Sequence, residues 1–259
     1  MPEGYQAAQA GDLLGGVIRR FMPTIVGVQT KKPVAALTFD DGPDPYYTPR
    51  LLELLQEHDA RATFFMLGSA ALEAPQVVRQ VADAGHAIGN HTHNHVAFTT
   101  LSAAERRREL RACARALAPY GLRLFRPPWG CQSLASRLDA LLLGYRVIGW
   151  NVSVADWNTD DPDEIAGRLR TRLKHGAIVL LHDALRTQAN QRYAPRDAML
   201  EGLGRVLREL RGRMRLVTVP ELLRYGPPLR RNWLRSAQEY VPTASPGEPA
   251  RKQDTTVSD

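Results

Sequence analysis

Buried apolar runs alternate with helical segments along most of this chain, and this alternation constrains the fold more than any other feature. Strongly apolar runs at residues 34–39, 62–67 and 177–181 predict buried strands. Alternation of strands and helices predicts a parallel sheet covered by helices. With about seven strands and 259 residues, a closed or nearly closed α/β barrel in a single domain fits best.

The remaining elements are shorter but follow the same order. Further strands are predicted at residues 86–89, 123–125, 146–151 and 215–219, and helices at residues 48–58, 75–84, 102–117, 132–143, 161–174, 195–211 and 220–225. Two helix starts are marked by their residue types. Ser102 and Glu105 form a capping-box pattern, and Pro162 occupies the first helical position after Asp161.

The two ends of the chain differ from the alternating centre. We expect residues 1–32 to be an N-terminal extension that packs on the barrel, residues 33–226 to be the barrel itself, and residues 227–259 to be a C-terminal extension. Residues 13–28 are apolar but are interrupted by Arg19, Arg20 and Pro23, so they predict an amphipathic helix rather than a membrane span. From residue 245 onward the composition predicts disorder.

No secretory signal or membrane-spanning segment is recognised, so a cytoplasmic location is favoured unless a leader has been removed. The formal net charge is +7, with arginines at residues 106–108, 205–215 and 230–231. We interpret these arginines as solvated helix faces and expect no nucleic-acid partner, while peripheral membrane contact through the basic surface stays open. Cys113 and Cys131 show no zinc-binding or disulfide spacing, and structural roles are expected for both. A monomer is favoured.

Several polar side chains follow predicted strands at the point where each strand ends. Asp40 and Asp41 come directly after the first strand, His182 follows residues 177–181, and Asp156 lies a few residues beyond the 146–151 strand. The carboxyl ends of parallel barrel strands meet on one face, which is where barrel active sites lie. We therefore expect these side chains to converge.

A histidine pair suggests a metal site near these carboxylates. His91 and His95 are four residues apart, so a helical turn would place both rings on one side. One carboxylate from Asp40 and Asp41 would complete a three-ligand open set, which is typical of a catalytic metal centre. The other carboxylate could take a proton from water. The alternative for the histidines is a purely structural pair.

A proline-rich segment adds a cation and a rigid loop. If Arg126 is buried beside a catalytic carboxylate, it would hold that group ionised and oriented. Pro128 and Trp129 would fix an irregular loop that directs a backbone N–H at a developing oxyanion. The alternative is an exposed arginine in an ordinary loop.

His182 is the candidate general acid for protonating a leaving amine. A neighbouring carboxylate would raise the pKa of this histidine; Asp156 is the candidate, with Asp183 as its rival. Leu180 and Trp157 would form apolar walls suited to a small acyl methyl group.

Taken together, five segments resemble the motifs of the polysaccharide deacetylases, carbohydrate esterase family 4. These are residues 38–44 (TFDDGPD), 91–95 (HTHNH), 126–130 (RPPWG), 156–157 (DW) and 180–183 (LLHD), in order along about residues 34–223. The resemblance implies an α/β fold that is a distorted (β/α)7, TIM-barrel-like barrel of about seven strands. It also implies a metal-dependent hydrolase that removes N-acetyl groups from an N-acetylated sugar polymer or oligomer.

The resemblance also implies individual roles. Asp40 would be the base, and Asp41, His91 and His95 the metal ligands. Arg126 would pair with Asp40, and the Trp129 N–H would contribute to an oxyanion hole. His182 would be the acid, and Leu180 would line an acetate pocket. Zinc is the metal implied first, with cobalt or another divalent ion as alternatives.

Two positions depart from the family pattern. Ser153 stands where the family often has an additional aspartate, so the tuning of His182 depends on Asp156. His93 lies between the two ligand histidines and could compete for metal.

Two other functions stay open from the sequence. One is a deformylase or other linear-amide hydrolase that acts on a lipid-linked or small-molecule substrate. The other is an inactive barrel that binds glycan without cleaving it, which would require the loss of a ligand, base or acid. No such loss is seen among the motif residues.

Overall fold

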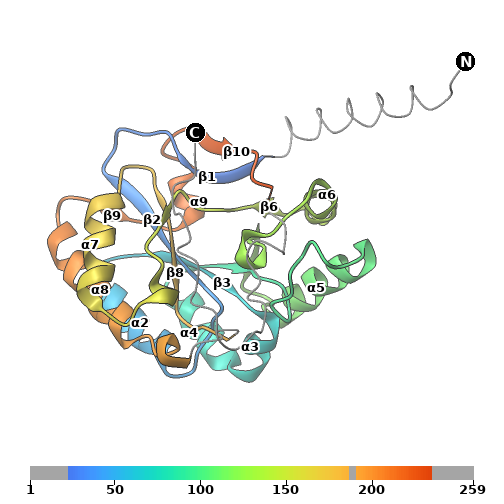
Figure 1. The fold of residues 1–259 in the computed structure, drawn as a ribbon, viewed down its shortest axis with the longest axis horizontal. Coiled ribbons are helices and arrows are strands. Elements are labelled where there is room, and N and C mark those ends of the chain that lie inside the picture. The colour runs from blue at the N-terminus through green and yellow to red at the C-terminus, as the bar shows by residue number, and fades with distance from the viewer. Residues whose placement is uncertain (1–22, 187–190, 235–259) are drawn as a thin grey trace, which may run out of the picture.

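The centre of the molecule is a curled parallel sheet with helices on its outer face (Figure 1). The computed structural model describes residues 23–186 and 191–234. The main sheet has the strand order β6-β5-β4-β3-β2-β8-β7, and β9 pairs with β2. Its strands are β2 (Val34–Asp40), β3 (Ala62–Met66), β4 (Ala87–Asn90), β5 (Gly121–Phe125), β6 (Arg146–Val147), β7 (Val152–Ser153), β8 (Ile178–His182) and β9 (Arg215–Leu216). The predicted parallel α/β barrel is confirmed.

Strand β2 shows how the sequence separates two apolar layers. Side chains alternate across a strand, so Ala35, Leu37 and Phe39 face the helices and belong to the larger core. Val34 and Ala36 belong to a second core inside the curl of the sheet, together with Phe65 and Ile178 from neighbouring strands. The same alternation continues to the end of β2 and turns Asp40 toward the interior.

Helices cover the outside of this sheet. They are α2 (Tyr47–Glu57), α3 (Gly68–Glu73), α4 (Pro75–Asp83), α5 (Ala103–Ala116), α6 (Leu134–Leu142), α7 (Pro162–Arg172) and α8 (Asp197–Leu210). The short helix α9 (Val219–Leu222) instead packs against the second core inside the curl, to which Val219 and Leu222 belong. The capping box of Ser102 and Glu105 is present at the start of α5. Asp161 caps α7, with Pro162 in its first turn. Both predicted helix starts are therefore confirmed.

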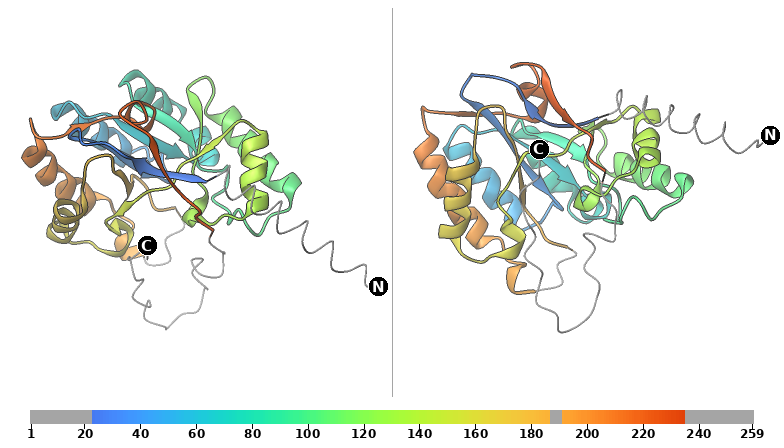
Figure 2. Two further views of the ribbon diagram at one scale, coloured as in Figure 1. Left: turned by 90° about the horizontal axis from the view of Figure 1, so that it is seen from above. Right: turned by 45° about the horizontal axis from the view of Figure 1, so that its top comes forward.

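Two strands from the ends of the described chain form a separate antiparallel pair, β1 (Thr24–Val28) with β10 (Pro228–Arg231). Figure 2 shows this ribbon lying across one end of the molecule. Ile25 also bridges to Ile148 and Gly27 to Ala177, so β1 links the residue after β6 with the residue before β8. The amphipathic-helix prediction is wrong for residues 24–28. This segment is rich in β-branched residues and is buried on both sides, as a strand.

The remaining expectations for the two ends are not tested. Residues 1–22 and the tail from 245 lie outside the described residues, and the boundaries at 32 and 226 stay predictions. None of the helices within residues 23–186 and 191–234 is long and apolar enough to cross a membrane.

The interpretation of the arginine-rich segments needs a correction. Arg106 does not lie on a solvated face: it is 8% exposed, and its Nε lies 2.7 Å from Asp139 Oδ2. Arg230 and Arg231 lie on β10 rather than on a helix. Because Arg106 pairs with an acidic residue of the neighbouring helix α6, net charge alone could not reveal its burial.

Candidate active site

Two adjacent aspartates leave the end of β2 in different directions. Asp40 is the last residue of β2 and lies in register with His182 on β8. Asp41 follows with a positive φ of 74°, which turns its side chain away from the line of the strand. Both are 4% exposed. A sequence of two aspartates thus yields two buried carboxylates with different neighbours.

Asp40 is held by a buried arginine. Arg126 Nη1 donates to Asp40 Oδ1 over 2.7 Å and to Thr38 Oγ1 over 2.7 Å. Its other nitrogens donate to the carbonyls of Ile148 and Gly149, and its guanidinium lies over the ring of Phe65. Arg126 is fully buried, so the exposed-loop alternative is wrong. The pairing leaves Asp40 Oδ2 toward the histidines, 3.9 Å from His91 Nε2.

Asp41 and the two histidines form a compact donor set. Asp41 Oδ1 lies 3.3 Å from His91 Nε2 and 3.2 Å from His95 Nε2. One donor atom from each residue lies within 4.8 Å of the others. His91 Nδ1 is 2.7 Å from the Arg126 carbonyl. A proton on Nδ1 would donate to that carbonyl and leave Nε2 as a lone-pair donor, the arrangement expected of a ligand histidine.

The predicted helical turn between His91 and His95 is wrong. The segment is an irregular loop in which Thr92 and His95 both have positive φ, 71° and 52°. Thr92 Oγ1 accepts from the His95 backbone N–H, and the Asn90 side chain accepts from the Thr92 N–H. These side-chain contacts replace helical hydrogen bonds and still bring both imidazoles to Asp41.

The donor set fits a divalent cation. Asp41 Oδ1 is buried and has no hydrogen-bond partner of acceptable geometry, although two imidazole nitrogens lie nearby. Burial alone would raise the pKa of Asp41, but His95 and His91 outweigh burial and hold this pKa well below its usual range. One carboxylate and two imidazoles are ligands suited to zinc and related ions, and three ligands leave a position open.

Backbone strain is concentrated in these loops. Among the described residues, six non-glycine positions have positive φ, and five of them lie in the candidate site: Asp41, Thr92, His95, Trp129 and Ala155. Each such position costs about 1–3 kcal/mol and persists only where surrounding contacts enforce it. Five of the six strained positions therefore lie on the face of the barrel where the predicted site residues meet.

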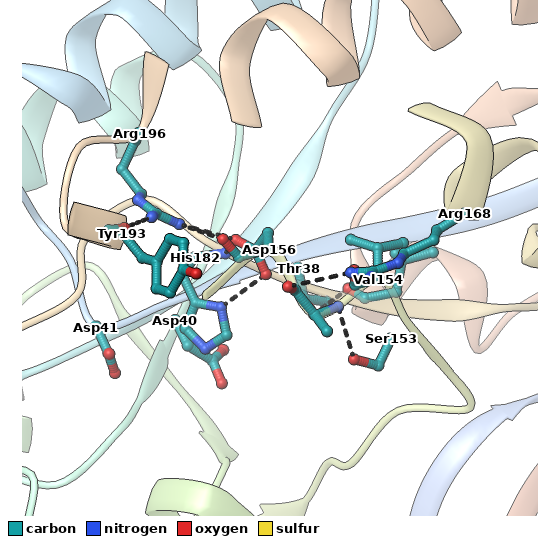
Figure 3. A network of polar contacts seen from close by, with 12 residues as sticks. Thr38, Asp40, Asp41, Ser153, Val154, Asp156, Arg168, His182, Tyr193 and Arg196 are labelled. Carbon is teal, nitrogen blue, oxygen red and sulfur yellow. Dashed lines mark hydrogen bonds and ion pairs between the residues drawn. The ribbon is translucent and has the colours of Figure 1, made fainter. Parts of the chain in front are cut away.

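His182 pairs with Asp156 beside Asp40 (Figure 3). His182 Nδ1 lies 3.0 Å from Asp156 Oδ1, and the His182 backbone N–H donates to Asp156 Oδ2 over 2.9 Å. Burial by itself would lower the pKa of His182. The charges of Asp156, Asp41 and Asp40 outweigh burial and raise this pKa to about 9.

The rival carboxylate has a different environment. Asp183 Oδ2 accepts from Thr48 Oγ1 over 2.5 Å, and burial raises the pKa of Asp183 to about 7. A side chain at Gly42 would collide with the Asp183 carboxylate, so glycine is required there. Asp183 therefore packs beneath the loop that carries Asp41 and does not pair with His182.

The four predicted substrate-contact residues line the same region. The Trp129 ring centroid lies 4.2 Å from that of His95, and the Trp157 ring meets His182 edge-on at 5.2 Å. Pro128 and Trp129 form a 3₁₀ turn, in which Trp129 has φ of 53°. Leu180 precedes His182 by two residues on β8 and so shares its face of the sheet.

Both departures from the family pattern have a place in the structure. Ser153 is half-buried on β7, and its carbonyl accepts from Arg172. His93 lies against Gly68 and is not part of the Asp41 donor set among the described residues.

Sequence reasoning missed two residues that complete the network. Thr38 bridges Arg126 to the Val179 carbonyl, and its position two residues before Asp40 on β2 was a usable signal. Arg196 is 1% exposed, and its Nη1 lies 3.3 Å from Asp156 Oδ2. No local pattern distinguishes Arg196 from the chain's other arginines, since its partner is 40 residues away.

A strand-end carboxylate pair, a three-residue donor set and a histidine–aspartate pair on a curled parallel sheet define a metallohydrolase-like barrel. The polysaccharide deacetylase family model matches residues 27–148. The chain is 36% identical over 203 residues to a peptidoglycan-N-acetylglucosamine deacetylase of Bacillus cereus, covering 76% of this chain and 92% of that protein. It is 31% identical to a chitooligosaccharide deacetylase of Sinorhizobium fredii, covering 74% and 93%.

A solved structure of another deacetylase has a similar fold. The crystal structure of the Bc1960 peptidoglycan N-acetylglucosamine deacetylase superimposes with a TM-score of 0.73 at 26% identity, covering 83% of this chain and 97% of that one. This chain belongs to the polysaccharide deacetylase family.

Proposed function

We propose that this chain is a metal-dependent N-deacetylase that hydrolyses the acetamide of an N-acetylated sugar polymer or oligomer. The observation that carries the proposal is the juxtaposition of two separate devices on one barrel face. One is the Asp41, His91 and His95 donor set, and the other is the His182–Asp156 pair. Asp40, in register with His182, lies between them along the sheet.

Asp40 is proposed as the base. Its Oδ1 is engaged by Arg126, so Oδ2 is the oxygen available to take a proton from the attacking water. A divalent ion held by Asp41, His91 and His95 would polarise the acetyl carbonyl and increase the acidity of water. Arg126 keeps Asp40 ionised and fixes its orientation, which a base needs before attack.

His182 is proposed as the acid. With Nδ1 hydrogen-bonded to Asp156, the proton on Nε2 faces the site and can pass to the leaving amine nitrogen. A pKa raised to about 9 keeps the imidazole protonated at neutral pH, as this role requires. The Trp129 N–H is proposed to donate to the developing oxyanion, and Leu180, Pro128 and Trp157 to enclose the acetyl methyl group.

Zinc is the proposed ion, because two imidazoles and one carboxylate with an open position are typical of catalytic zinc sites. Cobalt or another divalent ion would satisfy the same ligands. The proposed substrate is an N-acetylglucosamine-containing glycan, because the named relatives act on peptidoglycan or chitooligosaccharide.

The two alternatives are less well supported. A deformylase would use the same base, acid and ion, and differs only in the size of the acyl pocket. The apolar residues Leu180 and Trp157 favour acetyl over formyl. An inactive glycan-binding barrel would require a missing ligand, base or acid, whereas all of these residue types lie together here.

The test is acetate release from chitooligosaccharides, peptidoglycan fragments and acetylated xylan, measured with and without a chelator. We expect chelator-sensitive release from at least one N-acetylated glycan. A parallel assay with N-formylglucosamine compares acetate and formate release. Release of formate alone would favour the deformylase, and the absence of chelator-sensitive release of either acid would refute the proposal.

A further inference from the structure

A buried arginine, Arg196, lies behind the His182–Asp156 pair and has no role in the proposed reaction so far. Figure 3 shows the Asp156 carboxylate lying between the side chains of Arg196 and His182. Asp156 is 0% exposed and Arg196 is 1% exposed. Removing two charges from water costs several kcal/mol per ion, so such a pair persists only where geometry compensates for it.

The guanidinium contacts two segments at once. On one side, Arg196 Nη1 donates to the Asp156 carbonyl over 3.1 Å and lies 3.3 Å from Asp156 Oδ2. On the other side, Nε donates to the Ala194 carbonyl over 3.2 Å and Nη2 donates to the Tyr193 carbonyl. Arg196 thus ties the turn containing Asp156 to the segment that precedes α8.

These contacts restrict the rotation of the Asp156 carboxylate. Oδ2 receives two donors, the His182 backbone N–H and Arg196 Nη1. With Oδ2 held from both sides, Oδ1 is left directed at His182 Nδ1. A planar guanidinium suits this task, because its N–H groups have a fixed geometry and its charge does not depend on pH in the working range.

We propose that Arg196 is a positioning residue for the general acid: it fixes the Asp156 carboxylate and thereby holds His182 in the orientation that delivers a proton to the leaving group. This inference rests on the proposed deacetylation. Arg196 contacts no reacting atom and acts only through His182. The effect of its loss on the rate should therefore depend on whether the leaving group must be protonated. An amine leaving group needs protonation, whereas 4-nitrophenolate departs without it.

The experiment compares kcat/KM for N-acetylated chitotetraose and for 4-nitrophenyl acetate, with the rate that D40N retains subtracted as background. In R196M we expect the amide-to-ester ratio to fall by about 10- to 100-fold, the span for outer partners of functional groups. R196K cannot reach all four acceptors, so its amide-to-ester ratio should also fall. Because lysine retains the positive charge beside Asp156, this fall should be smaller than in R196M. Should R196M fail to fold, R196K decides by the same ratio.

R168M is the matched control. Arg168 holds the neighbouring main chain by donating to the Val154 carbonyl over 2.8 Å and pairs with Glu164; within the described part of the chain its polar partners do not include Asp156 or His182. Its loss should lower stability and leave the ratio within about twofold of wild type.

The results distinguish failure of the proposed deacetylase activity from failure of the positioning role of Arg196. If wild type releases no acetate from N-acetylated substrates, the proposed deacetylation fails. If wild type is active and the ratio is unchanged in both R196M and R196K, the positioning role fails. An equal fall in R168M would show a general loosening of the segment and would also refute the proposed role.

Discussion

Replacing Asp156 by asparagine tests the electrostatic basis of the proposed acid. Asparagine has nearly the same shape, so it removes the negative charge beside His182 while leaving the space filled. Asp156 is wholly buried and the His182 side chain is 13% exposed, so solvent screens this interaction only weakly. D156N should therefore lower the pKa of His182 substantially.

The magnitude follows from the opposing contributions at His182. The pKa is raised from 6.5 to about 9 even though burial acts to lower it. Each tenfold change in acidity is worth about 1.4 kcal/mol, so the surrounding carboxylates together stabilise the imidazolium by at least about 3 kcal/mol. Without Asp156, its charge and its hydrogen bond, the largest raising contributions, are lost while burial remains, so this pKa should fall well below 9 toward the ordinary value of 6.5. At pH 7.5 a group with the ordinary value is about one-tenth protonated, whereas the wild-type His182 is nearly all protonated.

The direction of the expected pH dependence follows from the raised pKa of His182. The imidazolium is complete well below pH 9 in the wild type and is lost as pH rises through that value, so the loss of the acid should lower amide hydrolysis on the alkaline side of the profile. In D156N the decline should begin more than one pH unit lower. A bound divalent cation would offset the contribution of Asp41 in both proteins, so the difference between them is retained.

The assays are the pH dependence of kcat/KM for an N-acetylated oligosaccharide and an NMR titration of His182 in metal-free protein. The His182 signal is assigned by its absence in H182Q. D160N, which removes an exposed carboxylate four residues away, is the control and should leave the profile unchanged. An alkaline limit and a His182 pKa that are the same in D156N and wild type would refute the reasoning.

Three further changes test other parts of the site. D40N should retain bound metal by elemental analysis and lose acetate release by about 10²–10⁴-fold, the span for a general base; retained turnover would exclude Asp40 from that role. R126M leaves Asp40 buried without its cation and should lower the urea-derived free energy of unfolding by about 3–5 kcal/mol, with a smaller combined loss in D40N/R126M than the sum of the single losses. Burial raises the pKa of Asp183 from 3.8 to about 7, so the folded protein binds the proton of this carboxyl more tightly than the unfolded chain does. The resulting contribution to the free energy of unfolding is complete below pH 3.8 and is lost as pH rises through 7. Metal-free D183N should therefore gain in Tm relative to wild type at pH 8 more than at pH 5, and an equal difference at both values would contradict the assignment.

Periodicity predicted most of the fold because it reports burial directly. The strongly apolar strands β2, β3 and β8 and the capped helices α5 and α7 were all predicted near their observed bounds. The two-residue strand β7 lies just beyond the strand predicted at residues 146–151 and was not predicted, because two residues carry no period. Strand β1 was misread, since its β-branched residues follow an apolar stretch that also suits a helix.

The residues of the site were predictable where a strand end places them. Asp40 and His182 follow apolar runs, and parallel strands bring such ends together. The route by which His91 and His95 reach Asp41 was not predictable, because it depends on the positive φ of Thr92 and on side-chain contacts within the loop. Arg196 was missed because its pairing with Asp156 is a contact between residues 40 positions apart in the sequence.

Calorimetric titration of zinc into metal-free protein tests the core of this account, which is that Asp41, His91 and His95 together bind one divalent ion. We expect one zinc per chain in the wild type and no comparable binding in H91A. A wild-type protein that binds no zinc, or an H91A variant that binds it with the same stoichiometry and affinity, would contradict the account.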